Sequence, residues 1–328
     1  MNYKNYLEKY QEIPYKIFEN SLQKNSFFHA YLLVGETGTP LKEIATYLAA
    51  CILSNENTFI DENNQICRQT FKNIYPNLIV LDTKEKQIKI DDIRELETRF
   101  SQTTSISNPR KVYIINEINN LGIDSINALL KFLEEPKDET YAILTTESEF
   151  RVIPTIKSRT EIIHFSLIEQ NELIQNAMNE GVSKEDAELL SFFYNDSSFI
   201  KENSLDEVYI ETKIVVTDLL SSINNKSEFL NITLNKVIKT VKDKISARNF
   251  FDFLIVFFKE ALKFRINKET ILTKYDNIIN RLSSLKKLED DIILLMNSRY
   301  EVGYNLNLSL LIINTLNKII ENELWNTT

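Results

Sequence analysis

Cysteine is scarce in this sequence, and its scarcity limits the kinds of protein that the chain can form. Cys51 and Cys67 are the only cysteines among 328 residues, so the sequence predicts no disulfide framework. The first residues, MNYKNYLEKYQEIP, are polar and lack the apolar core of a signal peptide. The most apolar stretch, residues 250–264, is too short and too charged to cross a bilayer, and we expect it to form a buried helix. We therefore expect a globular protein of the cytoplasm with no membrane segment.

Positive charge is also in deficit. The chain has 38 lysine and arginine residues against 47 aspartate and glutamate residues, which gives a net charge of -9. A protein that binds nucleic acid by itself through its overall electrostatic field needs a positive net charge. A local basic surface is still compatible with this composition, so the charge excludes a general field and not every contact with nucleic acid.

Proline and glycine are almost missing from the second half of the chain. No proline follows Pro154, and the only later glycines are Gly181 and Gly303. Before that point, four short and nearly continuous apolar runs alternate with helical patterns, as in strands buried on both faces of a parallel sheet. These runs are AYLLV (30–34), NLIVL (77–81), KVYIIN (111–116) and TYAILTT (140–146). We expect an α/β domain with a parallel sheet over residues 1–165.

Two helix starts can be placed in this first domain. In DSINALLKFLEEP, apolar residues recur at helical spacing, and we expect Asp124 to cap the helix and Pro136 to end it. After the first apolar run, Thr39 is expected to be the N-cap and Pro40 the first helical residue of a strand–turn–helix corner.

The remainder of the chain is expected to be helical. Residues 166–205 contain short helical patterns, and Ser183 followed by Asp186 has the spacing of a helix start. Residues 206–328 contain longer patterns, of which LLIINTLNKII is the last. One expected apolar stripe consists of Leu230, Leu234, Val237, Val241 and Ile245.

The segment GETGTPLK (35–42) has the frame of a phosphate-binding loop without its chemistry. It keeps Gly35 and Gly38 between an apolar run and a helical pattern. Pro40 stands in place of the second loop glycine, Leu41 in place of the lysine, and Lys42 in place of the hydroxyl residue that holds Mg²⁺. Because the charge, one N–H donor and the metal ligand are lost together, we expect neither ATP hydrolysis nor a bound cofactor.

The expected metal-binding position is altered as well. Asn116 stands where an aspartate would follow the third apolar run, and a neutral amide is a poorer ligand for Mg²⁺ than a carboxylate. Glu117 remains, but a base without bound nucleotide has nothing to activate. Tyr141, Thr145 and Thr146 end the fourth run, and we expect them to be structural.

NALLKFLEEP (127–136) and IPTIKSR (153–159), with a strand between them, resemble bacterial clamp-loader subunits of the AAA+ class. The broken loop together with the retained serine and arginine looks like the delta-prime type of DNA polymerase III subunit. This resemblance is dense over about residues 27–165 and weaker beyond. It implies an AAA+-like α/β domain (1–165), a small helical lid (166–205) and a helical collar (206–328). It also implies that the chain is a rigid, non-hydrolysing part of the polymerase holoenzyme.

The resemblance further implies a role in trans for one arginine. Arg159, with Ser158 beside it, matches the family's serine–arginine–cysteine motif, in which the arginine reaches the γ-phosphate of a neighbouring subunit. A planar cationic fork suits phosphate oxygens, although Thr160 replaces the cysteine. The implied partners are gamma/tau-type ATPase subunits and a delta subunit in a five-membered ring. The sliding clamp and primed DNA are implied partners of the whole complex.

Related subunits often carry a four-cysteine zinc knot, and this chain departs from that pattern. Thr70 stands where a C-x-x-C partner of Cys67 would be, and a structural zinc site needs about four nitrogen or sulfur ligands. We expect no metal, a core position for Cys51, and a structural role for His29. His164 is isolated in the sequence.

Two other functions compete with the non-hydrolysing subunit. One is an ATP-hydrolysing loader subunit or AAA+ motor with a divergent loop, and the losses at Pro40, Leu41, Lys42 and Asn116 argue against it. The other is an AAA+-like adaptor outside replication, which gives no reason to retain Arg159.

Overall fold

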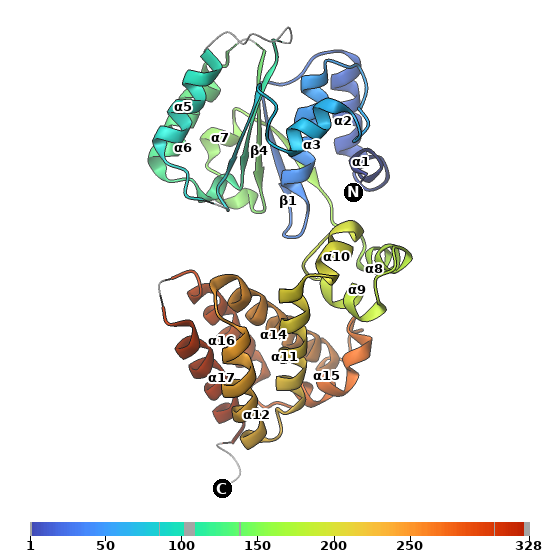
Figure 1. Cartoon of the computed structure of the whole chain (residues 1–328), viewed down its shortest axis with the longest axis vertical. Coiled ribbons are helices and arrows are strands. Elements are labelled where there is room, and N and C mark those ends of the chain that lie inside the picture. The colour runs from blue at the N-terminus through green and yellow to red at the C-terminus, as the bar shows by residue number, and fades with distance from the viewer. Residues whose placement is uncertain (1, 85, 102–108, 138, 305, 325–328) are drawn as a thin grey trace. The chain divides into compact units, whose positions relative to one another are not determined.

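The computed structural model describes residues 2–84, 86–101, 109–137, 139–304 and 306–324 (Figure 1). Its internal contacts divide the chain into two units. The first unit comprises Met1–Glu169 together with Tyr194–Asp196, and the second comprises Gln170–Phe193 together with Ser197–Thr328.

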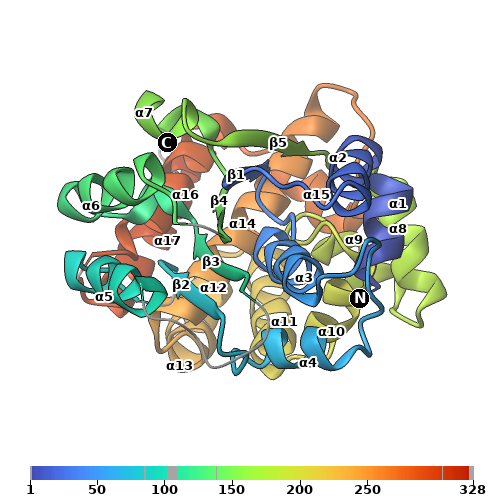
Figure 2. The same cartoon turned by 90° about the horizontal axis from the view of Figure 1, so that it is seen from above.

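A five-stranded sheet forms the centre of the first unit. Its strands lie side by side in the order β2-β3-β4-β1-β5, and every neighbouring pair is parallel (Figure 2). The strands are β1 (Ala30–Gly35), β2 (Leu78–Asp82), β3 (Lys111–Asn116), β4 (Thr140–Thr146) and β5 (Glu161–Phe165). The four predicted strands are confirmed. The fifth was not predicted, because exposed His164 interrupts its apolar pattern.

Helices cover both faces of this sheet (Figures 1 and 2). Helix α3 packs on one face against β1, β3 and β4, and α5 and α6 enclose a core cluster on the other. The helices of the unit are α1 (Tyr3–Tyr10), α2 (Glu12–Gln23), α3 (Leu41–Ser54), α4 (Gln65–Phe71), α5 (Ile90–Ser101), α6 (Ile123–Glu134) and α7 (Pro154–Lys157). Short 3₁₀ turns follow β3 (Ile118–Asn120) and β4 (Glu149–Arg151).

Both cysteines belong to this packing. Cys51 is buried in α3 and Cys67 in α4, and both are free thiols. Burial raises the pKa of Cys51 to about 12 and that of Cys67 to about 11. The prediction that Cys51 is a core residue is confirmed, and both thiols are poor nucleophiles at neutral pH.

Two predicted helix starts are wrong by one or two residues. Helix α3 begins at Leu41 with Pro40 in the N-cap position, and the Thr39 hydroxyl makes no cap. The Thr39 N–H instead donates to the Glu36 carbonyl and closes a turn there. The helix therefore begins one residue later than expected. Helix α6 begins at Ile123, so Asp124 lies in its first turn and Gly122 takes the cap position without a side-chain hydrogen bond. Asp124 still carries negative charge near the positive end of the helix.

The second unit is helical throughout its described residues. Helix α14 lies at its centre, packs against α11, α15 and α16, and buries Phe250, Phe251, Phe257 and Phe258. The buried helix expected at residues 250–264 is thereby confirmed. The helices are α8 (Gln170–Asn179), α9 (Lys184–Leu190), α10 (Ser197–Ser204), α11 (Glu207–Ser221), α12 (Lys226–Ile232), α13 (Ile238–Thr240), α14 (Lys244–Arg265), α15 (Asp276–Ser283), α16 (Leu288–Glu301) and α17 (Leu308–Leu324). A π-helical segment (Thr233–Val237) and a 3₁₀ turn (Thr273–Tyr275) complete the unit.

The predicted apolar stripe from Leu230 to Ile245 is not continuous. The π-helical segment changes the helical register after α12, and Asp243 starts a new helix with a capping box. Val237 and Val241 are buried as expected, whereas Leu234 and Ile245 are exposed. The pattern predicted a straight helix because neither interruption contains proline or glycine.

Helix α9 is fixed to a later part of the same unit. The Ser183 hydroxyl caps α9 by accepting from the Asp186 N–H, as predicted. Buried Glu188 accepts hydrogen bonds from the Thr273 N–H and hydroxyl at 3.0 and 2.8 Å.

The subdivision of the helical region at residue 205 stays a prediction. In the described part of the chain, no helix combines the length and apolar character that a membrane span requires.

Candidate functional site: a self-occupied phosphate loop and an exposed arginine

The loop after β1 keeps the backbone of a phosphate-binding turn. Gly38 has a φ of +95°, a conformation that favours glycine. At Gly35 an added Cβ would lie 3.0 Å from the Thr39 side chain, so Thr39 packs directly over that glycine. The loop is therefore shaped by the close approach of its own residues.

Lys42, in the first turn of α3, crosses to the second strand. Its Nζ lies 2.7 Å from Oδ2 of Asp82, the last residue of β2. Asn116 Nδ2 donates to the other Asp82 oxygen at 3.0 Å. Burial by itself raises the pKa of the Asp82 carboxyl, but the hydrogen bonds from Lys42, Asn116 and the Lys84 N–H outweigh it and hold the pKa below its ordinary value. The lysine nearest to the loop is thus already neutralised by a carboxylate.

Asn116 continues this network toward β4. Its Oδ1 accepts from the Thr145 hydroxyl at 2.8 Å, and the Thr145 oxygen in turn accepts from the Glu117 N–H at 3.0 Å. Asn116 and Glu117 are only 6% and 7% exposed. The amide of Asn116 therefore joins the carboxyl ends of three neighbouring strands.

Glu117 is held in a fixed position after β3. Its backbone is left-handed, with a φ of 55°, and its carboxylate accepts from the Glu147 N–H at 2.9 Å and from Thr146 Oγ1 at 3.3 Å. Asn119 Nδ2 donates to the same carboxylate at 3.3 Å and to Thr146 Oγ1 at 2.5 Å. Through these contacts Glu117 links the end of β3 to the end of β4.

Glu147 closes the network over the loop. One carboxylate oxygen forms an ion pair with Lys84, and the other accepts from the Thr37 hydroxyl at 3.0 Å. The remaining cavity has a volume of about 270 Å³ and is lined by Thr39, Leu41, Lys42, Glu43, Asp82, Lys84, Asn116, Glu117, Thr145 and Glu147. It is smaller than most sites for nucleotide-sized ligands, and its charged side chains are largely engaged with one another.

The sequence reasoning missed Asp82, Lys84 and Glu147. Asp82 could have been found, because polar residues at the carboxyl ends of neighbouring parallel strands converge on one edge of the sheet. Lys84 and Glu147 follow strands in loops whose course the apolar pattern does not determine. Within the described residues, no cluster of three or more histidine, cysteine, aspartate or glutamate side chains is arranged to hold a metal ion.

Arg159 lies in a separate cluster at the end of α7. Its Nη1 donates to the Thr155 carbonyl at 2.9 Å and to the Ser158 hydroxyl at 3.2 Å, and its Nη2 lies 2.6 Å from Glu134 Oε1 at the end of α6. The Arg159 side chain is 31% exposed and that of Glu134 is 50% exposed. These partners belong to α6, α7 and the residue after α7, so the structure groups Arg159 with Ser158 and not with Lys42, Asn116 or Glu117.

A second polar cluster lies before α7. Glu149 Oε2 lies 2.8 Å from His164 Nε2, and Glu149 Oε1 lies 3.3 Å from Lys157 Nζ. Hydrogen bonds from His164 and Lys157 hold the pKa of the Glu149 carboxyl below its ordinary value. His164 is thus a partner of Glu149 and not the isolated residue that its place in the sequence indicated.

The chain is similar in sequence to several DNA polymerase III subunits. A family model described as "DNA polymerase III, delta subunit" matches residues 10–169, which is nearly all of the first unit. DNA polymerase III subunit delta' of Bacillus subtilis is 27% identical over 263 residues, which are 80% of this chain and 80% of that protein. The chain is a relative of the DNA polymerase III delta-prime subunits. The resemblance seen in the sequence is confirmed.

Other relatives place the delta-prime-like chain within a wider group. Subunit delta' of Pseudomonas aeruginosa is 33% identical over 135 residues, which are 40% of this chain and 41% of that one. Subunit tau of Bacillus subtilis is 30% identical over 222 residues, which are 67% of this chain and 37% of that protein. A DNA polymerase III gamma subunit-related protein from Thermotoga maritima superposes with a TM-score of 0.59 at 16% identity, covering 94% of this chain and 99% of that one. The expected fold, an AAA+-type α/β domain followed by a helical region, is confirmed.

Proposed function

We propose that this chain is a non-hydrolysing subunit of a clamp loader. In this role it joins gamma/tau-type ATPase subunits and a delta subunit in a five-membered cytoplasmic ring that loads the sliding clamp onto primed DNA. Arg159 would act on ATP bound by a neighbouring subunit. One observation carries the proposal: the charged side chains around its phosphate loop are paired with one another, while its retained arginine is accessible and lies apart from that loop.

The loop argument rests on charge. A nucleotide phosphate entering the loop would meet Lys42 already paired with Asp82 at 2.7 Å. It would also meet Glu147, whose carboxylate closes the network through Lys84 and Thr37. Displacing Asp82 would leave a nearly buried carboxylate beside a phosphate, and like charges at short distance repel strongly in a poorly solvated site. The network supports a domain that keeps the AAA+ shape for docking without the chemistry of hydrolysis.

The argument for Arg159 rests on how weakly its present partner holds it. The Thr155 carbonyl and the Ser158 hydroxyl position one side of the guanidinium, and Glu134 is its one carboxylate partner among the described residues. A half-exposed ion pair of this kind contributes only about 0–1 kcal/mol. A phosphate carries more charge and more acceptor oxygens than the Glu134 carboxylate. It would therefore bind the Arg159 guanidinium more strongly than Glu134 does. Ser158 then acts as a positioning residue.

An ATP-hydrolysing subunit is the second candidate, and one observation favours it. The chain is similar to subunit tau over 67% of its length. Against it stand Pro40, which lacks an N–H, Leu41, which lacks a charge, and Asn116, whose amide is engaged by Asp82 and Thr145.

Reconstitution with the partner subunits tests the proposal. The loader is assembled with either the natural chain or the Arg159→Ala variant, and ATP hydrolysis and clamp loading are measured for both. We expect the variant to assemble normally and to hydrolyse ATP more slowly. Trans-supplied arginines contribute about 10³ to 10⁵ in rate at a single site, and a loader with several ATP sites loses less in total. Unchanged rates for a fully assembled variant loader would refute the role.

A further inference from the structure

Strand β2 is an edge strand whose outer side is uncovered by any other strand of the described residues. It pairs with β3 on one side and ends the sheet order β2-β3-β4-β1-β5. Two adjoining cavities, of about 310 and 600 Å³, lie along this edge and share Asn73, Val80 and Lys86 as lining residues. Edge strands with accessible backbone are templates for an added strand.

The direction of the backbone groups can be read from two hydrogen bonds. Val112 N–H donates to the Asn77 carbonyl, and Thr83 N–H donates to the Asn116 carbonyl. Because successive residues of a strand direct their backbone groups to opposite sides, the odd-numbered residues of this segment face β3. Leu78, Val80 and Asp82 therefore direct their N–H and C=O groups outward.

Most of the outward groups have no partner within the described part of the chain. The Leu78 N–H donates to the Tyr75 carbonyl, and the Asp82 carbonyl accepts from the Lys86 N–H, so the two ends of the edge are closed. Between them, the Leu78 carbonyl, both backbone groups of Val80 and the Asp82 N–H lack hydrogen bonds to described residues. These four groups alternate as acceptor, donor, acceptor and donor, which is the pattern that one short strand can satisfy.

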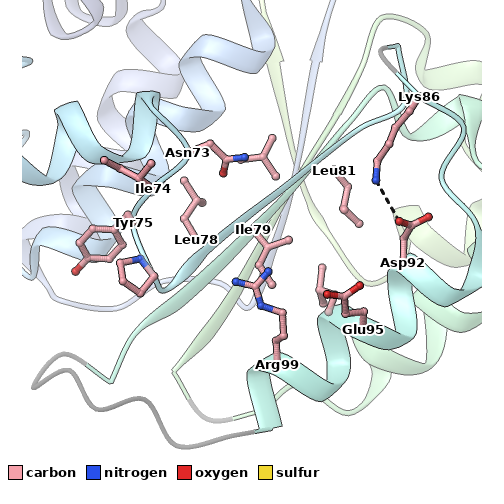
Figure 3. Close-up of a pocket in the computed structure, with 13 residues that line it drawn as sticks. Asn73, Ile74, Tyr75, Leu78, Ile79, Leu81, Lys86, Asp92, Glu95 and Arg99 are labelled. Carbon is pink, nitrogen blue, oxygen red and sulfur yellow. Dashed lines mark hydrogen bonds and ion pairs between the residues drawn. The ribbon is translucent and has the colours of Figure 1, made fainter.

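The two walls of this groove differ in chemistry (Figure 3). On the α4 side, Phe71 and Ile74 are large apolar residues exposed to 39% and 62%. On the α5 side, Lys86 is paired with Asp92 at 3.1 Å, whereas exposed Glu95 and Arg99 form no ion pair with any described residue. Glu95 and Arg99 are four positions apart and therefore lie on the same side of the helix.

We propose that the edge of β2 binds an extended peptide segment of a partner protein, as an added strand. Its alternate side chains would be apolar toward Phe71 and Ile74 and charged toward Glu95 and Arg99, with acid near Arg99 and base near Glu95. Backbone hydrogen bonds to Leu78, Val80 and Asp82 provide the affinity, and the two walls provide the specificity. This proposal is independent of the role of Arg159.

A second copy of this chain fits the groove less well. Pairing of two β2 edges would bring only the segment Leu78–Asp82 against its counterpart. Ile79 and Leu81 of that segment are buried in the core of their own unit, and Leu78 is buried too. Such a strand carries no basic residue for Glu95 and one acidic residue at its end, so the charges on α5 favour a partner with a different sequence.

Peptide binding to the full-length chain tests the proposal. The probes are short fluorescein-labelled peptides in which valine alternates with lysine and glutamate, and anisotropy reports binding. We expect saturable binding and slower hydrogen exchange at the Val80 amide. N-methylation of the peptide amides that face β2 keeps every side chain but removes at least two hydrogen bonds, and we expect about tenfold or greater weakening.

Charge variants provide matched controls on the same helix. Arg99→Glu is expected to weaken the original peptide several-fold and to improve binding of the peptide in which lysine replaces the facing glutamate. Arg94→Glu changes an arginine of α5 that pairs with Asp91 and does not line the groove, and we expect no effect. The proposal is overturned if no peptide saturates, if N-methylated peptides bind equally well, or if both variants behave alike. Protection of Val80 that rises with protein concentration alone would assign the edge to a second copy instead.

Discussion

Lys42 forms an ion pair with Asp82 across the mouth of the loop, with 2.7 Å between Nζ and Oδ2. Lys42 is the second residue of α3, the helix after β1, and Asp82 ends the edge strand β2. In a working phosphate loop, a lysine in this region binds phosphate. Here a lysine one position further along binds a carboxylate of its own chain, so its positive charge is used within the fold.

We first predict that Lys42→Met lowers the free energy of unfolding. The substitution leaves Asp82, whose side chain is 8% exposed, with a hydrogen bond from Asn116 but without its cation. The cost of an uncompensated buried acceptor is about 1–3 kcal/mol, and the partial exposure of Lys42 places the expected loss at the lower end. Urea denaturation at neutral pH measures it. Lys16→Met is the matched control, because Lys16 pairs with Glu12 on an exposed helix surface and such pairs contribute about 0–1 kcal/mol.

The second prediction concerns pH. The folded-state pKa of Asp82 is lower than its ordinary value of 3.8, so its contribution to stability is present above that value and is lost as pH falls through the folded-state pKa. In Lys42→Met the pKa rises toward 3.8, so Asp82 contributes less stability above that value and the loss of stability on acidification is smaller than in the natural chain. Urea denaturation across acidic pH measures the difference. Identical pH profiles for the two chains would show that Lys42 does not set the pKa of Asp82.

Third, we predict that the isolated chain binds neither ATP nor ADP with useful affinity. Pro40 and Leu41 remove a donor and a charge from the loop, and Asp82 neutralises the neighbouring lysine. Calorimetry with Mg-ATP should show no saturable heat, with a gamma/tau-type subunit as the positive control. A dissociation constant in the micromolar range accompanied by hydrolysis would promote the ATP-hydrolysing alternative.

Fourth, Glu134→Gln is expected to leave loader activity unchanged or to raise it, in contrast to Arg159→Ala. The substitution removes the carboxylate that lies 2.6 Å from the guanidinium but retains a side chain of the same shape. If Arg159 serves a neighbour's phosphate, loss of its competitor cannot harm that function. The isolated variant should lose no more than about 1 kcal/mol of stability. A Glu134→Gln loader as slow as the Arg159→Ala loader would show that the ion pair itself is what matters.

Fifth, we predict that an exposed apolar stripe on α16 contributes to assembly of the ring. Ile293, Met296 and Tyr300 are exposed to 58%, 48% and 70% and follow helical spacing. Met296→Lys should preserve folding but reduce incorporation into the loader, as measured by gel filtration with partner subunits. Ile123→Lys, at a 78% exposed position of α6, is the control and should be incorporated normally. Full-length variants are preferable to a cut at residue 205, because Glu188 binds Thr273 across that point.

The sequence predicted those parts of the fold that local pattern determines. Four strands were predicted because each is a nearly continuous apolar run, and the Ser183 cap follows from a spacing rule. Contacts between distant segments left no such signal. Residues Tyr194–Asp196 return to the first unit, where the Asn195 N–H donates to the Gly38 carbonyl and Asn195 Oδ1 accepts from the Ile168 N–H.

The candidate site was predicted in outline only. The sequence alone shows that Leu41 and Asn116 stand where a phosphate-binding lysine and a metal-binding aspartate would be. What replaced that chemistry is not visible, because Asp82 and Glu147 come from segments far apart in the sequence, and Lys42 reaches Asp82 through the direction of its side chain. Sequence thus predicts which function is absent more readily than which contacts have taken its place.

The left-handed backbone at Glu117, with a φ of 55°, has a consequence for how the chain's stability depends on ligands. Such a conformation costs about 1–3 kcal/mol for a residue other than glycine, and the four hydrogen bonds that its N–H and carboxylate make to Thr145, Thr146, Asn119 and Glu147 offset that cost from within the chain. Proteins that depend on a ligand for such support gain stability in proportion to its concentration. This chain supplies the support from its own residues, so we expect its stability not to vary with the concentration of ATP or ADP.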